Sequence, residues 1–265
     1  MDKETYLRRL GGSIRDKLRV VEFIPKVEGN VLDVGCADGT VTKAMALERP
    51  EMEFLGVDLS YSSIHESLNS ELPVNADFKR GYLRDLLMEP DRYDAVTFIS
   101  VLHEFYSYGQ GISSVVKALA DAHELLKGNG VIIIRDMIFH DYAHQMLLGG
   151  DKMYHRIMDT PKGRTLYSKA QEFKDRYGLA SFADINHFLL KILYEDNWKH
   201  EMKENYTPVT FEQYQDIFRL LGMKVDFWDS YLLDYITHEW SKRFGLRFEA
   251  LRMLRSTGLL VARKK

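Results

Sequence analysis

The feature that most constrains the fold is a series of short apolar runs, separated by amphipathic segments, in the first half of the chain. The apolar runs lie at 31–34, 54–57, 95–99 and 131–134. Continuous apolar character over so few residues is typical of parallel strands that helices cover on both faces. The intervening segments have helical spacing at 40–47, 60–68 and 113–126. The last of these helices is expected to end at the turn Lys127-Gly128-Asn129-Gly130.

The pattern changes after Asp136. Residues 137–208 contain no strand pattern and are rich in Met, His, Tyr and charged side chains. Ser181 and Asp184 form a capping box that predicts the start of a helix within this segment. A second capping box, Thr210 with Gln213, predicts another helix, and apolar runs at 223–228 and 258–262 predict two further strands, joined by a long connection.

Composition limits the function classes. The chain has 265 residues, 45% of them apolar, which is enough for one large core. Cys36 is the only cysteine, so an internal disulfide and a cysteine-based zinc site are excluded. The charged N-terminus lacks the apolar core of a signal peptide, and no apolar run approaches the roughly 20 residues of a membrane span. We therefore expect a cytoplasmic protein.

The most informative motif is the strand and turn Val31-Leu32-Asp33-Val34-Gly35-Cys36-Ala37-Asp38-Gly39. An acid lies inside the strand, Thr40 replaces the third glycine of a dinucleotide fingerprint, and a second strand ends in Asp58. This combination resembles the class I S-adenosylmethionine-dependent methyltransferases. Segments 77–86, 92–105 and 125–135 resemble later blocks of the same family in the same order, so the resemblance covers roughly residues 30–136, with a looser match over 209–265.

The resemblance implies a Rossmann-like α/β fold with a mostly parallel seven-stranded sheet, flanking helices and a helical insert after the fifth strand. The implied divisions are a helical flank over 1–29, a cofactor-binding domain over 30–136 and 209–265, and a lid over the acceptor site at 137–208. It implies S-adenosylmethionine as the methyl donor and no metal. The residues it assigns to cofactor binding are Arg15, Asp33, Gly35, Cys36, Ala37, Asp38, Gly39, Asp58, Leu59, Tyr82, Leu83 and Ser100.

Two of these assignments have specific chemical content. Asp58, at a strand end, can accept hydrogen bonds from both ribose hydroxyls. Tyr82 departs from the family pattern, which has an acid after the glycine corresponding to Gly81. Tyr82 can stack on the adenine or be an ordinary loop residue, and Asp85 is the alternative partner for the adenine.

Methyl transfer to a protonated acceptor also needs a base. His103 follows the fourth strand and has an ordinary pKa near 6.5, which suits proton transfer. Glu104 and Asp136, at the end of the fifth strand, are the other candidates, and a histidine that only packs or caps its helix is the alternative.

The acceptor is less constrained than the donor. A small organic molecule is favoured, because small-molecule members of the family vary most in this insert. RNA, tRNA for example, is the alternative, through the basic residues Lys242, Arg243, Arg247, Arg252 and Arg255. A methyltransferase-like module that binds the cofactor without turnover is a third hypothesis. An NAD-dependent dehydrogenase is disfavoured by Asp33 and Thr40.

Overall fold

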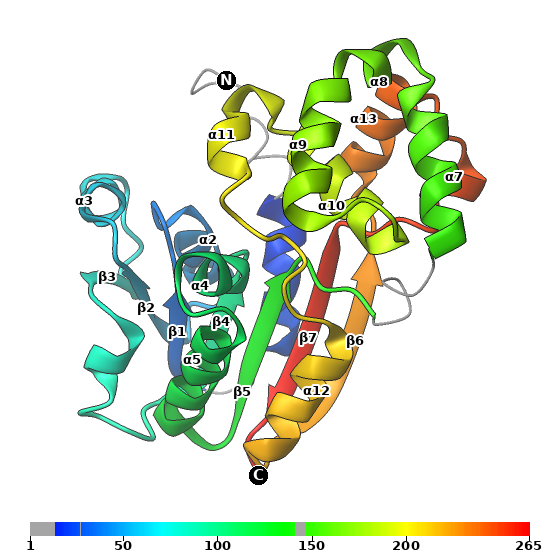
Figure 1. Ribbon diagram of the computed structural model, residues 1–265. Coiled ribbons are helices and arrows are strands. Elements are labelled where there is room, and N and C mark those ends of the chain that lie inside the picture. The colour runs from blue at the N-terminus through cyan, green and yellow to red at the C-terminus, as the bar shows by residue number, and fades with distance from the viewer. Residues whose placement is uncertain (1–13, 27, 141–146) are drawn as a thin grey trace. The chain divides into compact units, whose positions relative to one another are not determined.

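A computed structural model describes residues 14–26, 28–140 and 147–265. Within them, seven strands form one sheet in the order β3-β2-β1-β4-β5-β7-β6 (Figure 1). The strands are β1 (Gly29–Val34), β2 (Met52–Asp58), β3 (Ala76–Arg80), β4 (Tyr93–Ile99), β5 (Leu126–Asp136), β6 (Lys224–Tyr231) and β7 (Thr257–Arg263). The four pairings from β3 to β5 are parallel, which agrees with the predicted α/β class. After β1 the chain builds β2 and β3 on one side and β4 and β5 on the other, so the topological switch point lies between β1 and β4.

Short helical elements precede and connect the first five strands. They are η1 (Leu18–Phe23), α2 (Thr40–Glu48), α3 (Tyr61–Asn69), η2 (Leu83–Leu86), α4 (Leu102–Tyr108) and α5 (Ile112–Leu125). Helices α2 and α3 pack against β2 and β3, and α5 packs against β5. Val31, Leu32 and Val96 are fully buried in the sheet, as expected for strands that helices cover.

The segment after β5 is helical, as predicted. Its elements are α7 (Leu147–Met158), α8 (Pro161–Thr165), α9 (Tyr167–Tyr177), α10 (Phe182–Ile192), η3 (Glu195–Asn197) and α11 (Trp198–Glu201), followed by α12 (Phe211–Leu220). The predicted capping box is present, because Ser181 Oγ accepts from the Asp184 amide and Asp184 accepts from the Ser181 amide. Thr210 and Gln213 bond reciprocally at the start of α12 in the same way. No helix in the described part of the chain is both long and apolar enough to span a membrane.

The chain divides into two compact units. The sheet unit comprises described residues up to 136 together with 215–229 and 259–265, and the helical unit comprises 137–214 and 230–258. Residues 230–258 were expected to belong with the sheet. They form α13 (Asp234–Phe244) and α14 (Phe248–Leu251), and Ile236, Trp240 and Phe244, spaced four apart, are buried in the apolar core of the helical unit. The division therefore differs from the expected one, because this helical stripe packs with other helices.

Two further details differ from the sequence predictions, and a third is described only in part. Strand β3 was not predicted, because at the sheet edge its side chains alternate between buried and exposed and form no apolar run. Strand β5 begins at Leu126, where a helix end and turn were expected; a register irregularity opposite Tyr93–Ala95 and a positive φ of 64° at Asn129 accommodate the extra residues. Of the expected N-terminal helical flank, residues 1–13 lie outside the described residues, and 14–23 are helical.

Candidate functional site

The turn after β1 forms the floor of the candidate site. Gly35, Ala37 and Gly39 have positive φ values of 72°, 49° and 76°, a backbone conformation that glycine adopts freely and that alanine adopts only uncommonly. The Gly35 and Cys36 amides donate to the Val57 carbonyl oxygen at 2.8 and 3.1 Å, which ties the turn to β2. A Cβ atom at Gly35 would lie 2.3 Å from a methyl group of Val101, so this position also requires glycine for packing.

Asp58 lies at the carboxyl end of β2, next to this turn. One of its carboxylate oxygens accepts from the Ala37 amide at 3.0 Å, and the other accepts from the Ser60 amide at 2.8 Å. Each oxygen of a carboxylate can accept a second hydrogen bond. The half-buried Asp58 therefore shapes the turn and keeps acceptor capacity for two hydroxyl groups, while the neighbouring Leu59 is 52% exposed.

Asp33 and Cys36 have side chains that support the turn from within the protein. The Asp33 carboxylate is 2% exposed and accepts from the hydroxyls of Thr42 at 2.5 Å and Thr97 at 2.7 Å. Burial raises the pKa of Asp33 to about 6, and the two threonine hydrogen bonds oppose this shift. Burial also raises the pKa of the Cys36 thiol, so it remains protonated. The structure therefore brings these two residues to the turn but directs neither side chain into an open site.

The loop after β3 contains the departure at Tyr82. Its ring is 53% exposed, and the Arg84 guanidinium lies 4.8 Å from the ring centroid. The Asp85 carboxylate accepts from the Tyr82 amide at 2.8 Å and so caps η2, while Leu83 is buried. Tyr82 therefore offers an accessible aromatic face, whereas Asp85 is already used by the backbone. Asp38 is likewise used in part, since it accepts from the Thr40 amide at 3.0 Å.

His103 and Asp136 form a buried dyad at the carboxyl ends of β4 and β5. Nδ1 of His103 lies 2.9 and 3.1 Å from the two carboxylate oxygens of Asp136, and the His103 amide donates to the same carboxylate at 3.1 Å. A carboxylate can only accept in this contact, so Nδ1 carries the proton and Nε2 of the neutral ring is an acceptor. Glu104, the third candidate, is exposed on α4. The structure therefore joins two of the three predicted catalytic residues.

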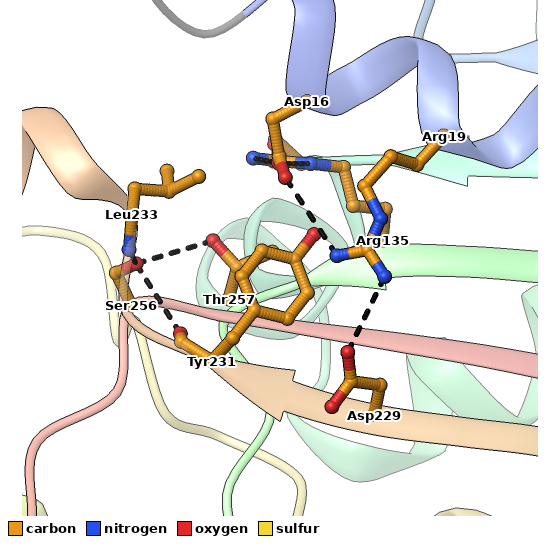
Figure 2. A network of polar contacts seen from close by, with 9 residues as sticks. Asp16, Arg19, Arg135, Asp229, Tyr231, Leu233, Ser256 and Thr257 are labelled. Carbon is orange, nitrogen blue, oxygen red and sulfur yellow. Dashed lines mark hydrogen bonds and ion pairs between the residues drawn. The ribbon is translucent and has the colours of Figure 1, made fainter. Parts of the chain in front are cut away.

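Arg135, which precedes Asp136, binds the N-terminal segment and the corner after β4. Its Nε and Nη2 donate to one Asp16 carboxylate oxygen at 2.9 and 2.5 Å, and its Nη1 donates to the Ser100 hydroxyl at 3.0 Å. Ser100 has a positive φ of 58°, and its amide donates to the Arg135 carbonyl oxygen at 2.7 Å. Figure 2 shows the contact between Arg135 and Asp16 and two more, because Arg19 forms ion pairs with both Asp16 and Asp229.

Lys17, which was not among the predicted residues, interacts electrostatically with the turn and the dyad. Burial and the nearby Arg135 guanidinium lower its pKa to about 8, and Asp33, Asp38 and Asp136 act on it in the opposite direction. Its ammonium therefore lies within electrostatic range of the turn and of the dyad. Arg15, which the resemblance assigned to the cofactor, is exposed. Sequence contained no signal that separated these two basic residues, because only the packing of the segment decides which one faces the sheet.

The basic residues near the C-terminus do not form one free surface. Arg243 pairs with Glu239 at 3.0 Å and lies 3.8 Å from Glu195, and Arg255 donates to the carbonyl oxygens of Arg252 and Leu254. Lys242, Arg247 and Arg252 are exposed. In the described part of the chain, no group of three His, Cys, Asp or Glu side chains is placed to hold a metal ion.

A sheet of this order, with a glycine turn at the switch point and an acid at the end of β2, is that of the class I methyltransferase fold. Residues 25–206 match the model of a family described as a methyltransferase domain, so the chain belongs to the methyltransferase-domain family. A curated relative, the probable methyltransferase ltbC of Aspergillus luteorubrus, is 26% identical over 136 residues, which is 48% of this chain and 46% of the relative. The chain thus spans about half the length of that relative.

Solved structures share the fold. A chain from the complex of the Haloferax volcanii Trm112 methyltransferase activator with a methyltransferase has a TM-score of 0.60 at 16% identity, covering 97% of this chain and 93% of that one. An S-adenosylmethionine-dependent methyltransferase from Mesorhizobium loti has a TM-score of 0.55 at 15% identity, covering 93% and 95%. The [4+2]-cyclase SpnF has a TM-score of 0.55 at 14% identity, covering 95% and 80%. At these identities the similarity establishes the fold alone.

Proposed function

We propose that this protein transfers the methyl group of S-adenosylmethionine to a hydroxyl or another protonated group of a small organic molecule, with His103 as the general base. The His103–Asp136 dyad is the observation that carries this proposal. Asp136 fixes the ring with Nδ1 as the donor, so Nε2 is the nitrogen of the neutral ring that would take up a proton. A passive cap of α4 would need only the contact between the His103 amide and Asp136, so the second contact, through the ring, favours a base.

The residues around the turn fit S-adenosylmethionine chemically. Asp58 has acceptor capacity for the ribose hydroxyls, and the exposed ring of Tyr82 offers a face for the adenine. The amino-acid end of the cofactor carries a carboxylate and an ammonium group. Lys17 would provide a cation for the carboxylate, and Asp38 would provide an anion for the ammonium.

The proposed reaction needs positioning and one proton transfer. When bound, the cofactor would supply an electrophilic methyl group to the acceptor oxygen and would leave as S-adenosylhomocysteine. Nε2 of His103 accepts the hydroxyl proton, and Asp136 stabilises the imidazolium that results. Products are the methylated acceptor, S-adenosylhomocysteine and one proton, which His103 later returns to water.

A small-molecule acceptor is favoured over RNA because some of the basic residues assigned to RNA binding are bound by other groups of the protein. Arg243 and Arg255 are engaged by neighbouring acids and carbonyl groups, so three exposed cations remain of the five assigned to RNA. Phosphate binding generally depends on several free cations on one face. The role of residues 137–208 as a lid stays a prediction.

Calorimetry tests the donor, and turnover tests the base. Titration with S-adenosylmethionine and S-adenosylhomocysteine should show micromolar binding, while NAD, the control, should not bind. With a panel of phenols, carboxylic acids, amines and bulk tRNA, release of S-adenosylhomocysteine should occur with a small molecule. The His103→Gln variant should bind cofactor normally and lose at least about a hundredfold in rate. Turnover with tRNA alone, or an unaffected His103→Gln variant, would contradict the proposal.

A further inference from the structure

The described N-terminal segment is held differently at its two ends. At its C-terminal end, Val20, Val21 and Ile24 are buried, and the rings of Phe23 and Phe227 lie 4.5 Å apart. The Arg49 guanidinium also donates to the carbonyl oxygens of residues 24 and 25. Residues 14–19 are half-buried or exposed, and two of them, Asp16 and Arg19, make ionic contacts. The segment thus has an apolar anchor at 20–25 and an ionic attachment upstream.

The ionic attachment depends on Arg135. Its side chain is 6% exposed and reaches Asp16 with two nitrogens and Ser100 with the third. A second pair, Arg19 with Asp229 at 3.3 Å, is longer and more exposed. A buried guanidinium without its carboxylate strongly destabilises a folded protein, whereas an exposed ion pair contributes little. The Asp16 contact therefore contributes more to holding the segment than the Arg19 contact does.

We propose that Arg135 is a positioning residue that latches the N-terminal segment through Asp16 and thereby holds Lys17 at the cofactor turn. Lys17 follows Asp16 directly, so the position of its ammonium relative to Asp33, Asp38 and Asp136 depends on this attachment. Arg135 also holds the Ser100 corner, and the next residue, Asp136, orients His103. The end of β5 therefore positions three parts of the protein: the N-terminal segment, the corner after β4 and the proposed base, His103. The inference rests on the proposed binding of S-adenosylmethionine at this turn.

The latch predicts coupled changes in affinity and mobility. Asp16→Asn removes the carboxylate charge that binds Arg135. The conformation in which the N-terminal segment is attached to Arg135 should then be populated in only a minority of molecules. If its population falls to about a tenth, the affinity for S-adenosylhomocysteine falls by about tenfold. Asp16→Glu keeps the carboxylate and should recover most of the loss. Glu22→Gln, which alters an exposed acid on the same segment, is the matched control and should bind like wild type.

Two measurements on the same variants decide the question. Calorimetry with S-adenosylhomocysteine gives the affinity, and hydrogen exchange by mass spectrometry of the ligand-free protein gives the protection of residues 14–23. Asp16→Asn should lower both. Lys17→Met should lower the affinity and leave the protection unchanged, because it removes the cation but keeps the latch. Circular dichroism confirms that each variant is folded.

The outcomes separate the latch from the proposed function. Unchanged protection in Asp16→Asn overturns the latch, and so does lost protection with unchanged affinity. If wild-type protein does not bind S-adenosylhomocysteine, the proposed function fails, whereas hydrogen exchange of the ligand-free variants still decides whether Asp16 holds the segment.

Discussion

Replacement of Asp33 by asparagine tests whether the buried acid beneath the cofactor turn costs the fold stability. The carboxylate lies between the hydroxyls of Thr42 and Thr97 and is 2% exposed. Asparagine has the same shape and no charge. The Thr97 hydroxyl also lies 3.4 Å from the Leu32 carbonyl oxygen, so it can donate there and accept from the new amide. The substitution should therefore keep the local packing.

The magnitude follows from the shift in the pKa of Asp33 from its ordinary value of 3.8 to about 6. Between these values the folded protein holds a proton that the unfolded chain has lost, so stability falls as pH rises through this window. At about 1.4 kcal/mol per pH unit, the difference corresponds to about 3 kcal/mol. This cost is absent below pH 3.8 and complete above pH 6. Asp33→Asn should remove it.

The assay is urea unfolding of wild type and Asp33→Asn at several values between pH 4 and pH 7.5, followed by circular dichroism. The difference in unfolding free energy should change in favour of the variant by about 2.5 kcal/mol across this range, because a small part of the cost is already present at pH 4. Other groups titrate equally in both proteins and cancel. Parallel stability curves for the two proteins would show that Asp33 is ionised without cost and would refute the reasoning.

Three other predictions follow from the described contacts. Asp58→Ala should weaken S-adenosylhomocysteine binding by about tenfold to a hundredfold in calorimetry, through two lost acceptors, whereas Glu53→Ala on the same strand should bind normally. Asp136→Asn removes the anion that orients His103 and would stabilise its imidazolium, so turnover should fall at least about tenfold while S-adenosylhomocysteine binding stays normal; an unchanged rate would contradict the dyad. Burial lowers the pKa of Lys191 to about 7 while the unfolded chain keeps this proton to about 10.5, so Lys191 should make stability rise with pH between these values. Lys191→Met should make that rise smaller in urea unfolding, and equal slopes in the two proteins would contradict the shift.

Short-range sequence patterns predicted most of the strands and two of the helix starts. Strands β1, β2, β4, β6 and β7 and the two capping boxes lie where apolar runs and capping residues predicted them, because these signals depend on neighbours in sequence. Edge strand β3 carried no such signal. The allocation of 230–258 to the helical unit could not be predicted either, since it depends on which apolar stripe packs with which core.

The features of the candidate site also fall into those that the sequence determined and those that only the tertiary structure decided. Sequence alone determined that a turn of small residues follows a buried strand, that Asp58 ends the next strand, and that His103 and Asp136 follow two others. Only the tertiary structure decided that His103 and Asp136 meet, that Asp33 points inward, and that Lys17 rather than Arg15 faces the sheet. The physical reason is that strand order and helix rotation set distances between side chains far apart in the chain, and no periodicity along the sequence encodes those distances.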